Sequence, residues 1–328
     1  MGNPSPTSAL GTLRPDLGGS LMQIDLDMDQ QGLIANRVAP VIESERQAGT
    51  FGKMTVEQLL QTYDTTRTSS GDYNRITQNL GDANFATKEQ GIEAPVDARN
   101  AAIYGAFFDA ELLAAKRARD VVLRNREIRT AALLFNASTW TGASLTTAVG
   151  TEWSTASSAT PITNVEAAIR KVWEGTGLWP NALIINRLVF RNLRNCAQII
   201  ERIAASGAGA PVKPADITEQ MIAQCFDLNY VIVAGSAKNS ANAGQTRSIA
   251  QIWSSEYAMV ARVAETDNIE EPCVARTIHW GGDGSQIGTA AETYEDPRSR
   301  STIVRARHET QELVLYPEAA HLLSNITA

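Results

Sequence analysis

Apolar positions are sparse between residues 49 and 97 and become frequent immediately afterwards. Thr, Ser, Gly, Asp and Asn dominate the middle of this segment, and apolar residues alternate with polar ones only around 73–76 and 85–92. Alternation predicts strands, so we expect a long, two-stranded, hairpin-like loop. An isolated hairpin is marginally stable in water, and this one therefore needs another surface on which to lie.

Residues 98–135 carry apolar side chains at steps of three, four or seven, which predicts one uninterrupted helix starting after Asp97 as N-cap. At 1.5 Å per residue the helix would be about 57 Å long. The expected buried stripe is Ile103, Phe107, Ala110, Ala114, Ala118, Val121, Ile128, Ala132 and Phe135. The expected solvent face carries Lys116, Arg117, Arg119, Arg124, Arg126 and Arg129. The hairpin-like loop has too few apolar residues for a core of its own, and it is joined directly to a long helix. This combination indicates a subunit that completes its folding against neighbouring subunits.

In the second half of the chain, predicted helices and predicted strands alternate, as in an ordinary α/β region. Capping boxes at Thr163–Glu166 and Asp216–Glu219 predict helix starts, and Asn186 is a third candidate cap. The expected strands are 182–185, 230–234, 252–253, 257–263 and 301–316, with a polar loop over 235–247.

Composition narrows the class of protein. Of the 328 residues, 43% are hydrophobic and 20% are charged, as in soluble globular proteins, and no apolar run is long enough to cross a membrane. The three cysteines are widely spaced, so we expect reduced thiols rather than a disulfide framework. A formal net charge of −7 argues against a protein that binds the phosphates of nucleic acids. A shell of acidic subunits, however, could enclose DNA without adhering to it.

The search for chemical motifs predicts neither a catalytic nor a cofactor nor a metal site. The Asp25–Asp29 run resembles a calcium loop but lacks the required Gly and Glu, and Gly282–Gly288 departs from the dinucleotide fingerprint. His279, His308 and His321 lie in different elements, and their spacing indicates structural roles. We therefore expect a protein that is not an enzyme.

Several segments, in their order, resemble one known family. They are Phe51-Gly52-Lys53, residues 66–71, the run 90–97 before the long helix, and the strand start Gly177-Leu178-Trp179-Pro180-Asn181. Residues 252–253, 257–260 and 277–280 continue the series. The chain resembles the major capsid protein of tailed bacteriophages, whose fold is shared with encapsulins and the floor of herpesvirus capsids.

The resemblance implies an α+β fold with five parts. These are an N-terminal arm (1–48), an extended E-loop hairpin (49–97), a P domain (98–160) with a spine helix (98–135), a mixed α/β A domain (161–275), and a return to the P domain (276–328). E-loop contacts to the neighbouring subunit are expected from Phe51, Lys53, Arg67, Tyr73, Arg75, Phe85 and Lys88.

The same resemblance implies a function. Hexamers and pentamers of the chain would form an icosahedral virion shell around double-stranded DNA, without sequence-specific binding or a membrane. Expected partners are a separate scaffolding protein, a portal and decoration proteins, with assembly in the host bacterial cytoplasm. Two alternatives remain at this point: an encapsulin-like compartment that holds a protein cargo, and a cytosolic α/β enzyme built on residues 161–270.

Overall fold

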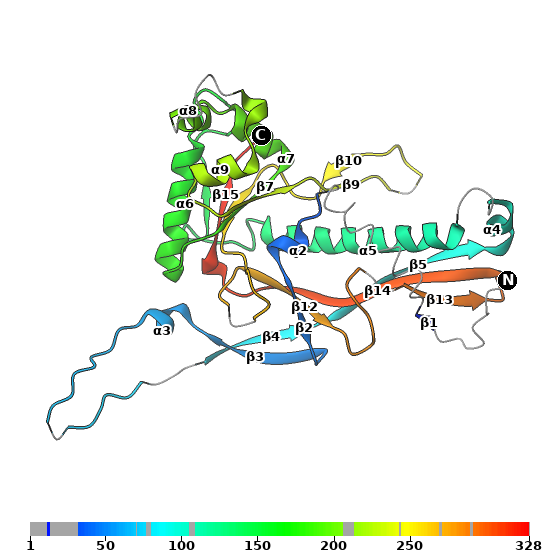
Figure 1. Cartoon of the computed structure of the whole chain (residues 1–328), viewed down its shortest axis with the longest axis horizontal. Helices are drawn as coiled ribbons and strands as arrows, with labels where there is room; N and C mark the ends of the chain where they lie inside the picture. Colours follow the sequence, from blue (N-terminus) through cyan, green and yellow to red (C-terminus); the bar gives the residue numbers. More distant parts are fainter. Residues whose placement is uncertain are drawn as a thin grey trace.

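The computed structural model of the chain describes residues 12–13, 32–69, 71–76, 80–104, 109–205, 213–242, 244–268, 271–288 and 291–327. Two sheets are joined by one long helix (Figure 1). One sheet and its helices form the upper left of the view, and the other sheet extends to the right beneath the long helix. A hairpin arm projects at the lower left, and the mixture of helices and sheets confirms the predicted α+β class.

The strand β14 (Ser301–Val314) is the centre of the long, six-stranded sheet. It pairs antiparallel with β5 (Lys88–Asp97) along one edge. Along its other edge it pairs with β13 (Ala291–Asp296) and then with β12 (Ala275–Trp280). The sheet is completed by β2 (Val41–Ser44), parallel to β12, and by β1 (Thr12–Leu13), beside β13.

The predicted uninterrupted helix over 98–135 is wrong, because two helices occupy this stretch. They are α4 (Ala98–Tyr104) and α5 (Ala110–Leu134). Asp109 has extended backbone angles, and its carboxylate accepts hydrogen bonds from the amides of Glu111 (3.0 Å) and Leu112 (3.1 Å). An Asp that satisfies two free amides in this way starts a new helix. The expected cap at Asp97 is present, since its carboxylate accepts from the Arg99 amide at 2.9 Å.

The helix α5 lies on β5 and β14 through small side chains. Ala115 packs with Val96 and Val304, and Ala118 packs with Val122 and Ala306. The buried face is rotated from the predicted stripe: Ala132 is exposed, whereas Arg119 and Arg126 are each only 3% exposed. Because long arginine side chains sit among the buried positions, apolar periodicity alone did not locate this face.

The second sheet has five strands in the order β6 (Thr146–Ala148), β15 (Ala320–Ser324), β11 (Ala258–Ala261), β7 (Ala182–Asn186) and β8 (Tyr230–Ala234). Every residue of β7 is buried, as expected of a central strand with a continuous apolar run. One face packs against four helices: α6 (Pro161–Thr176), α7 (Arg187–Asn195), α8 (Ala197–Ala205) and α9 (Glu219–Cys225). The other face packs against Leu134, Trp140 and Trp253.

The predicted start signals coincide with some of the helix starts and miss others by a few residues. Asn186 caps α7 as predicted, accepting from the Leu188 and Val189 amides. The helix predicted to start at Thr163 begins at Pro161, since proline is well suited to a first helical position. It ends at Gly177, whose φ of 69° favours glycine. The cap of α9 is Thr218, while Asp216 belongs to a short 3-10 turn (Pro214–Asp216).

The boundaries of the five predicted parts need changes. The last segment, 276–328, does not stay with the long sheet, because β15 crosses into the second sheet after a 3-10 turn (Pro317–Ala319). Likewise β6, within the predicted 98–160 part, pairs with β15. Residues 32–44 of the predicted N-terminal arm form α2 (Ala35–Val38) and β2, which are packed in the body.

The predicted hairpin arm is present but shorter than 49–97. It consists of β3 (Ala48–Met54) paired with β4 (Leu80–Ala86), and α3 (Val56–Leu60) follows β3. Residues 88–97 are β5 and belong to the long sheet. A second, unexpected hairpin starts within the predicted polar loop (235–247) and ends just beyond it, formed by β9 (Ala237–Asn239) and β10 (Ile249–Gln251). Within the described residues, no helix is long and apolar enough to cross a bilayer.

The Asp109 cap yields a stability prediction. We expect Asp109→Ala to lower the free energy of unfolding by about 0.5–2 kcal/mol, because two amides at the start of α5 lose their acceptor. Urea unfolding of the unassembled subunit measures the change. Asp109→Asn, which keeps an acceptor oxygen, should retain most of the stability, and an unchanged midpoint for the alanine variant would contradict the assignment.

Candidate assembly surfaces

A buried carboxylate, Glu127 on α5, joins three parts of the chain. Its two oxygens accept hydrogen bonds from the amides of Ile34 and Ala35, each at 2.8 Å, at the start of α2. The Trp253 indole N–H, next to the second sheet, also donates to it at 2.6 Å. Glu127 is 1% exposed, and burial raises the pKa of its carboxyl group, whereas the three donors act to lower that pKa.

Two arginines on the same helix extend this junction to the long sheet. The Arg126 guanidinium donates to Asn36, to the Ala39 carbonyl and to Thr277 at 3.2–3.4 Å. Arg129 forms a bidentate pair with Glu312 at 2.9 and 3.0 Å. Burial lowers the pKa of Arg126 to about 10, so its guanidinium is still charged at neutral pH. These side chains hold α2, α5 and the long sheet in one arrangement.

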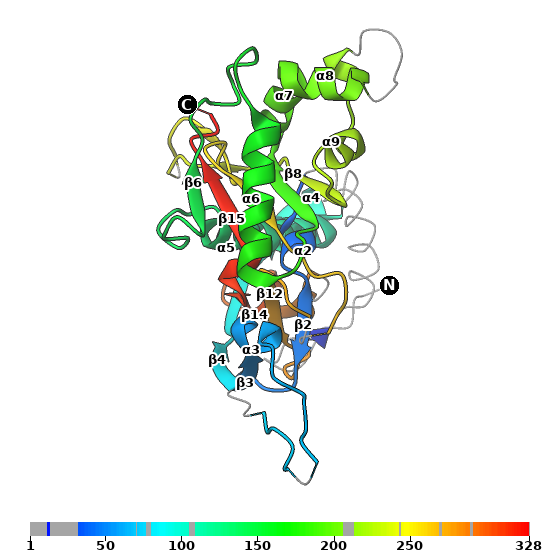
Figure 2. The ribbon, with the colours of Figure 1, turned by 90° about the vertical axis from the view of Figure 1, so that its left-hand side faces the viewer.

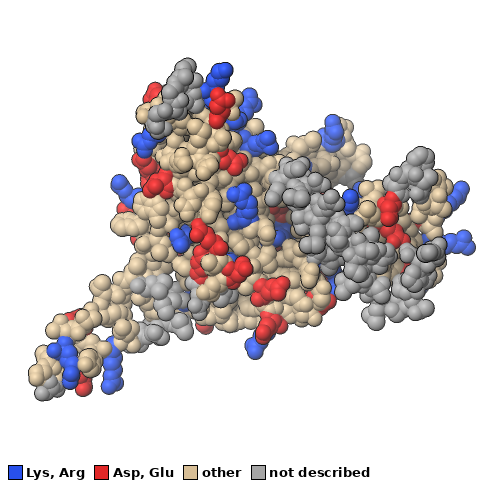
Figure 3. Space-filling view, viewed as in Figure 1, with Lys and Arg blue, Asp and Glu red and all other residues tan. Residues whose placement is uncertain are grey.

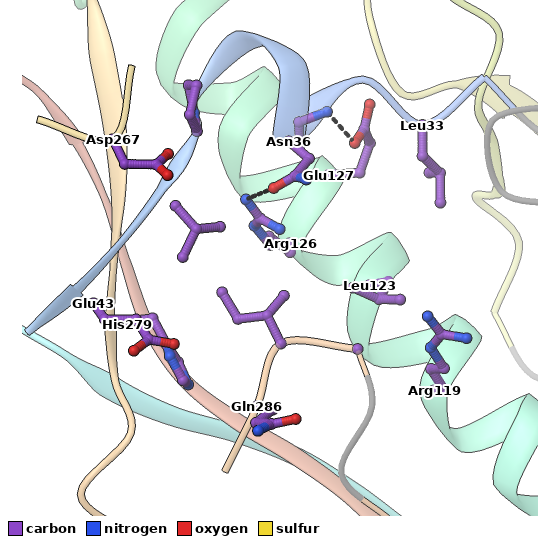
Figure 4. A pocket seen from close by; sticks show the side chains of 15 residues that line it. Leu33, Asn36, Glu43, Arg119, Leu123, Arg126, Glu127, Asp267, His279 and Gln286 are labelled. Carbon is purple, nitrogen blue, oxygen red and sulfur yellow. Dashed lines mark hydrogen bonds between the residues drawn. The ribbon is translucent and has the colours of Figure 1, made fainter. Parts of the chain in front are cut away.

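A cavity of about 770 Å³ opens beside this junction. Figure 4 shows side chains of both charge signs around it, including Arg119, Arg126, Glu43, Asp267 and His279. Glu127 and Arg126 are already engaged by the body of the protein. Among the described residues, no group of three His, Cys, Asp or Glu side chains is placed to hold a metal ion. Two of the charged groups in its wall, Glu127 and Arg126, therefore belong to a structural junction.

The three histidines are buried in separate strands, as expected for structural residues. His279 is on β12, His308 on β14 and His321 on β15, where the His321 ring nitrogens meet the Ser144 carbonyl (2.8 Å) and Thr147 (3.0 Å). Burial lowers the pKa of all three. For His308 it lowers the pKa to about 3, with the charges of Arg129 and Arg126 acting in the same direction.

Of the two segments that resemble a calcium loop and a dinucleotide fingerprint, the structure describes only the second. The Asp25–Asp29 run lies outside the described residues. In the Gly282–Gly288 segment, the Asp283 carboxylate pairs with Arg307 and accepts from the Ser285 amide, which is the chemistry of a surface turn.

Three of the proposed E-loop contact residues pack at the root of the arm. Phe51 packs against the buried cluster of Ala264, Cys273 and Leu315, and its ring centroid lies 6.2 Å from that of Phe85. The Lys53 ammonium donates to the Leu315 carbonyl and lies 4.1 Å from the centre of the Tyr316 ring. Within this chain, Phe51, Lys53 and Phe85 therefore fix the root of the arm to the body.

The other four residues are exposed. Tyr73 is 72% exposed, and the Arg67 guanidinium lies over its ring at 4.7 Å. Arg75 is exposed beside it, and Lys88 is exposed on β5. Figure 3 shows basic side chains on the projecting tip at the lower left. The arm thus has a root anchored in its own subunit and a tip that is free to contact another molecule.

Comparison with known proteins supports the architecture. No model of a known protein family matches the chain. The major capsid protein of Burkholderia phage BcepMu is 23% identical over 298 residues, covering 89% of this chain and 91% of that protein. The major capsid protein of Pseudomonas phage JBD67 is 22% identical and covers 90% and 92% of the two chains.

Solved structures agree with these relatives. A phage-related protein from Bordetella bronchiseptica has a TM-score of 0.70 at 16% identity, covering 97% of this chain and 98% of that one. An encapsulin from Synechococcus elongatus has a TM-score of 0.51 at 12% identity, covering 88% and 84%.

A long helix on an extended sheet, a second compact α/β sheet and a projecting arm are the architecture that this chain shares with structural proteins of capsids and encapsulins. The two curated relatives match this chain along nearly their whole length, so the chain is similar to phage major capsid proteins in both sequence and fold. The encapsulin alternative has less support.

Glu127 yields a prediction on the junction. We expect Glu127→Ala to lower the free energy of unfolding by at least about 3 kcal/mol, because three buried N–H groups lose their acceptor at about 1–3 kcal/mol each. Urea unfolding followed by tryptophan fluorescence measures the loss. Glu201→Ala, at an exposed position on α8, serves as the control, and equal stability of the two variants would exclude the proposed junction.

His308 yields a prediction on pH dependence. Its folded-state pKa of about 3 lies below the ordinary histidine value, so the unfolded chain binds the extra proton as the pH falls below about 6.5. The stability associated with neutral His308 is therefore complete above about pH 6.5 and decreases by about 1.4 kcal/mol per pH unit below it. Urea titrations between pH 7 and 4 should show a shallower slope for His308→Leu, and parallel curves would contradict this account.

Proposed function

We propose that copies of this chain assemble into hexamers and pentamers, which close into the icosahedral head shell of a phage. The observation that carries the proposal is the anchored arm with its exposed tip, where Tyr73 is 72% and Ile76 is 64% exposed. Large apolar side chains with this exposure favour burial against another chain. An arm that contacts a different surface of an identical neighbour makes a heterologous contact, which closes into rings.

The seven E-loop residues divide between two roles in this proposal. Arg67, Tyr73 and Arg75 at the tip contact the neighbouring subunit, and exposed Lys88 extends that contact on β5. Phe51, Lys53 and Phe85 hold the root, so that the tip leaves the body in a defined direction.

The proposed shell surrounds double-stranded DNA without reading its sequence. The net charge of −7 supports a wall that does not adhere to packaged DNA. A scaffolding protein, a portal and decoration proteins are the proposed partners, and the shell assembles in the host bacterial cytoplasm before it forms part of the virion.

A different observation would identify each of the two alternative functions. An encapsulin-like compartment would enclose a protein cargo, and purified particles would then contain that cargo instead of DNA. A cytosolic enzyme would need a pocket with converging catalytic groups. The cavity beside Glu127 supports a structural role, because Glu127 and Arg126 in its wall bind other parts of the same chain.

The arm tip yields an assembly prediction. The backbones of Met54 and Leu80 are paired at the end of the β3–β4 ladder, so an Asn-Gly turn in place of residues 55–79 should close the hairpin. We expect the wild-type chain to form closed particles in electron micrographs. The shortened chain should remain folded and soluble but form no closed particles, since it lacks the contact to its neighbour.

Circular dichroism and thermal unfolding provide the control for folding of the shortened chain. Closed particles at wild-type yield from that chain would exclude the arm from assembly. A wild-type chain that remains monomeric in light scattering, under all conditions tried with its phage's scaffolding protein, would contradict the shell function itself.

A further inference from the structure

Two tryptophans on the outer side of the second sheet are unusually exposed. Trp173 is 51% and Trp179 is 49% exposed, whereas Trp140, Trp153 and Trp253 are at most 1% exposed. Trp173 lies near the end of α6, and Trp179 follows that helix. Half-exposed tryptophans are costly to leave in water and are enriched at the centres of protein interfaces.

The two rings line a groove of about 570 Å³ between α6, α8 and α9. Phe226 and Cys225 contribute to its lining. The Trp179 indole N–H already donates to the Asp227 carbonyl at 3.3 Å, so the remaining exposed surface of that side chain is mainly the apolar ring. The groove's charged side chains sum to −1, from Glu166, Glu174 and Asp227 against Arg170 and Arg202.

The unexpected β9–β10 hairpin has complementary properties. Ile249 on β10 is 70% exposed, although it is a large apolar residue. Residues 235–251 include Lys238 and Arg247 but no Asp or Glu, so the segment has a charge of +2. Its end is held in shape by Asn239, whose side chain accepts from the Ser248 amide at 2.9 Å and from the Ala241 amide at 3.2 Å. A preorganised, basic hairpin with an apolar side chain is suited to an acidic, aromatic groove.

The groove and the hairpin lie on opposite sides of the subunit. In Figure 1, α6 forms the left edge and the β9–β10 hairpin projects to the right above α5. Figure 2, seen from that left side, shows α6 at the front. The hairpin therefore cannot fill the groove of its own chain. It is placed to fill the groove of the next chain in a ring, which is a heterologous contact.

The projecting arm lies on the same side as the groove. It leaves the body below α6 in Figure 1, and α3 at its root contacts the end of that helix. A Cβ atom built on Gly177 would be 2.9 Å from the Leu60 Cδ1 atom, which shows how closely the two segments approach. A neighbour that receives the arm is thus on the correct side to present its hairpin to the groove.

We propose that the β9–β10 hairpin of one subunit docks into the Trp173–Trp179 groove of its neighbour, with Ile249 between the two indole rings. This inference rests on the proposed shell function and names a second contact within the ring, separate from the arm. Lys238 and Arg247 lie toward Glu174 and Asp227 of the groove and orient the hairpin.

Cysteine crosslinking tests the pairing directly. In a Cys225→Ser background, Ser248→Cys beside Ile249 combined with Arg170→Cys on the groove should form disulfides between neighbours when assembled particles are oxidised, because both positions are exposed and both central side chains are kept. Since each subunit offers both partners on opposite sides, non-reducing gels should show a ladder that rises beyond dimers to the ring size. Each single cysteine variant in the same background is the control and should show no ladder.

The outcomes separate this contact from the shell function. Particles of the double variant that give only monomers, or a ladder equal to that of the single variants, overturn the docking but leave the shell intact. A species limited to dimers also overturns it, because a self-complementary contact cannot continue around a ring. If no particles form even from the wild-type chain, the proposed function itself fails.

Assembly yield provides a second, independent measurement. Ile249→Asp and Trp173→Asp should each reduce the yield of particles by about tenfold or more, as expected for central interface residues. The conservative variants Ile249→Val and Trp173→Phe should retain most of the yield. Because these positions are exposed in the subunit, its thermal unfolding should change little, and unchanged particle yield from both Asp variants would overturn the proposal.

Discussion

The Glu127 carboxylate is the interaction on which the arrangement of this subunit depends. It lies on α5, accepts from two amides at the start of α2, and accepts from the Trp253 indole beside the second sheet. A buried carboxylate is costly unless its oxygens are hydrogen-bonded, so the three donors must keep their places around it. Arg126 and Arg129 add the long sheet to the same junction. One helix turn thus determines how the main parts of the molecule are oriented.

This junction explains how one chain combines a rigid body with surfaces that are incomplete alone. The long sheet and α5 interlock through Ala115, Ala118 and Val122, and small side chains permit that close packing. The arm tip, the tryptophan groove and the β9–β10 hairpin all lie outside this packed region. Tyr73, Trp173 and Ile249 keep half or more of their surface exposed in the single subunit. A rigid body fixes the directions of these surfaces, as repeated contacts between identical chains require.

Local signals in the sequence predicted many elements correctly. The Asn186 cap, the buried strand after Pro180 and the long strand near residue 301 are each set by neighbouring residues. The fold class and the resemblance to phage capsid proteins were also predicted, because the order of the segments is a property of the whole chain. The break at Asp109 was missed, since an Asp inside a helical pattern has the same apolar spacing around it whether it caps or continues.

The candidate surfaces were predicted less well, for a physical reason. Periodicity sorts residues into apolar and polar faces, but it assigns a charged residue to solvent unless its partner is known. Glu127 finds its donors at residues 34, 35 and 253, which are distant in the sequence. The hairpin at 237–251 contains few apolar residues, so its strands resemble a polar loop until their pairing is known.

The sequence by itself determined the helices and strands that nearby residues specify, the sparse arm, and the family whose segment order the chain shares. Only the tertiary structure decided that Arg126 and Glu127 are buried, that β15 crosses into the second sheet, and that groove and hairpin lie on opposite sides. These features depend on contacts between residues far apart in the chain, and their free energy is gained only when the whole subunit has folded.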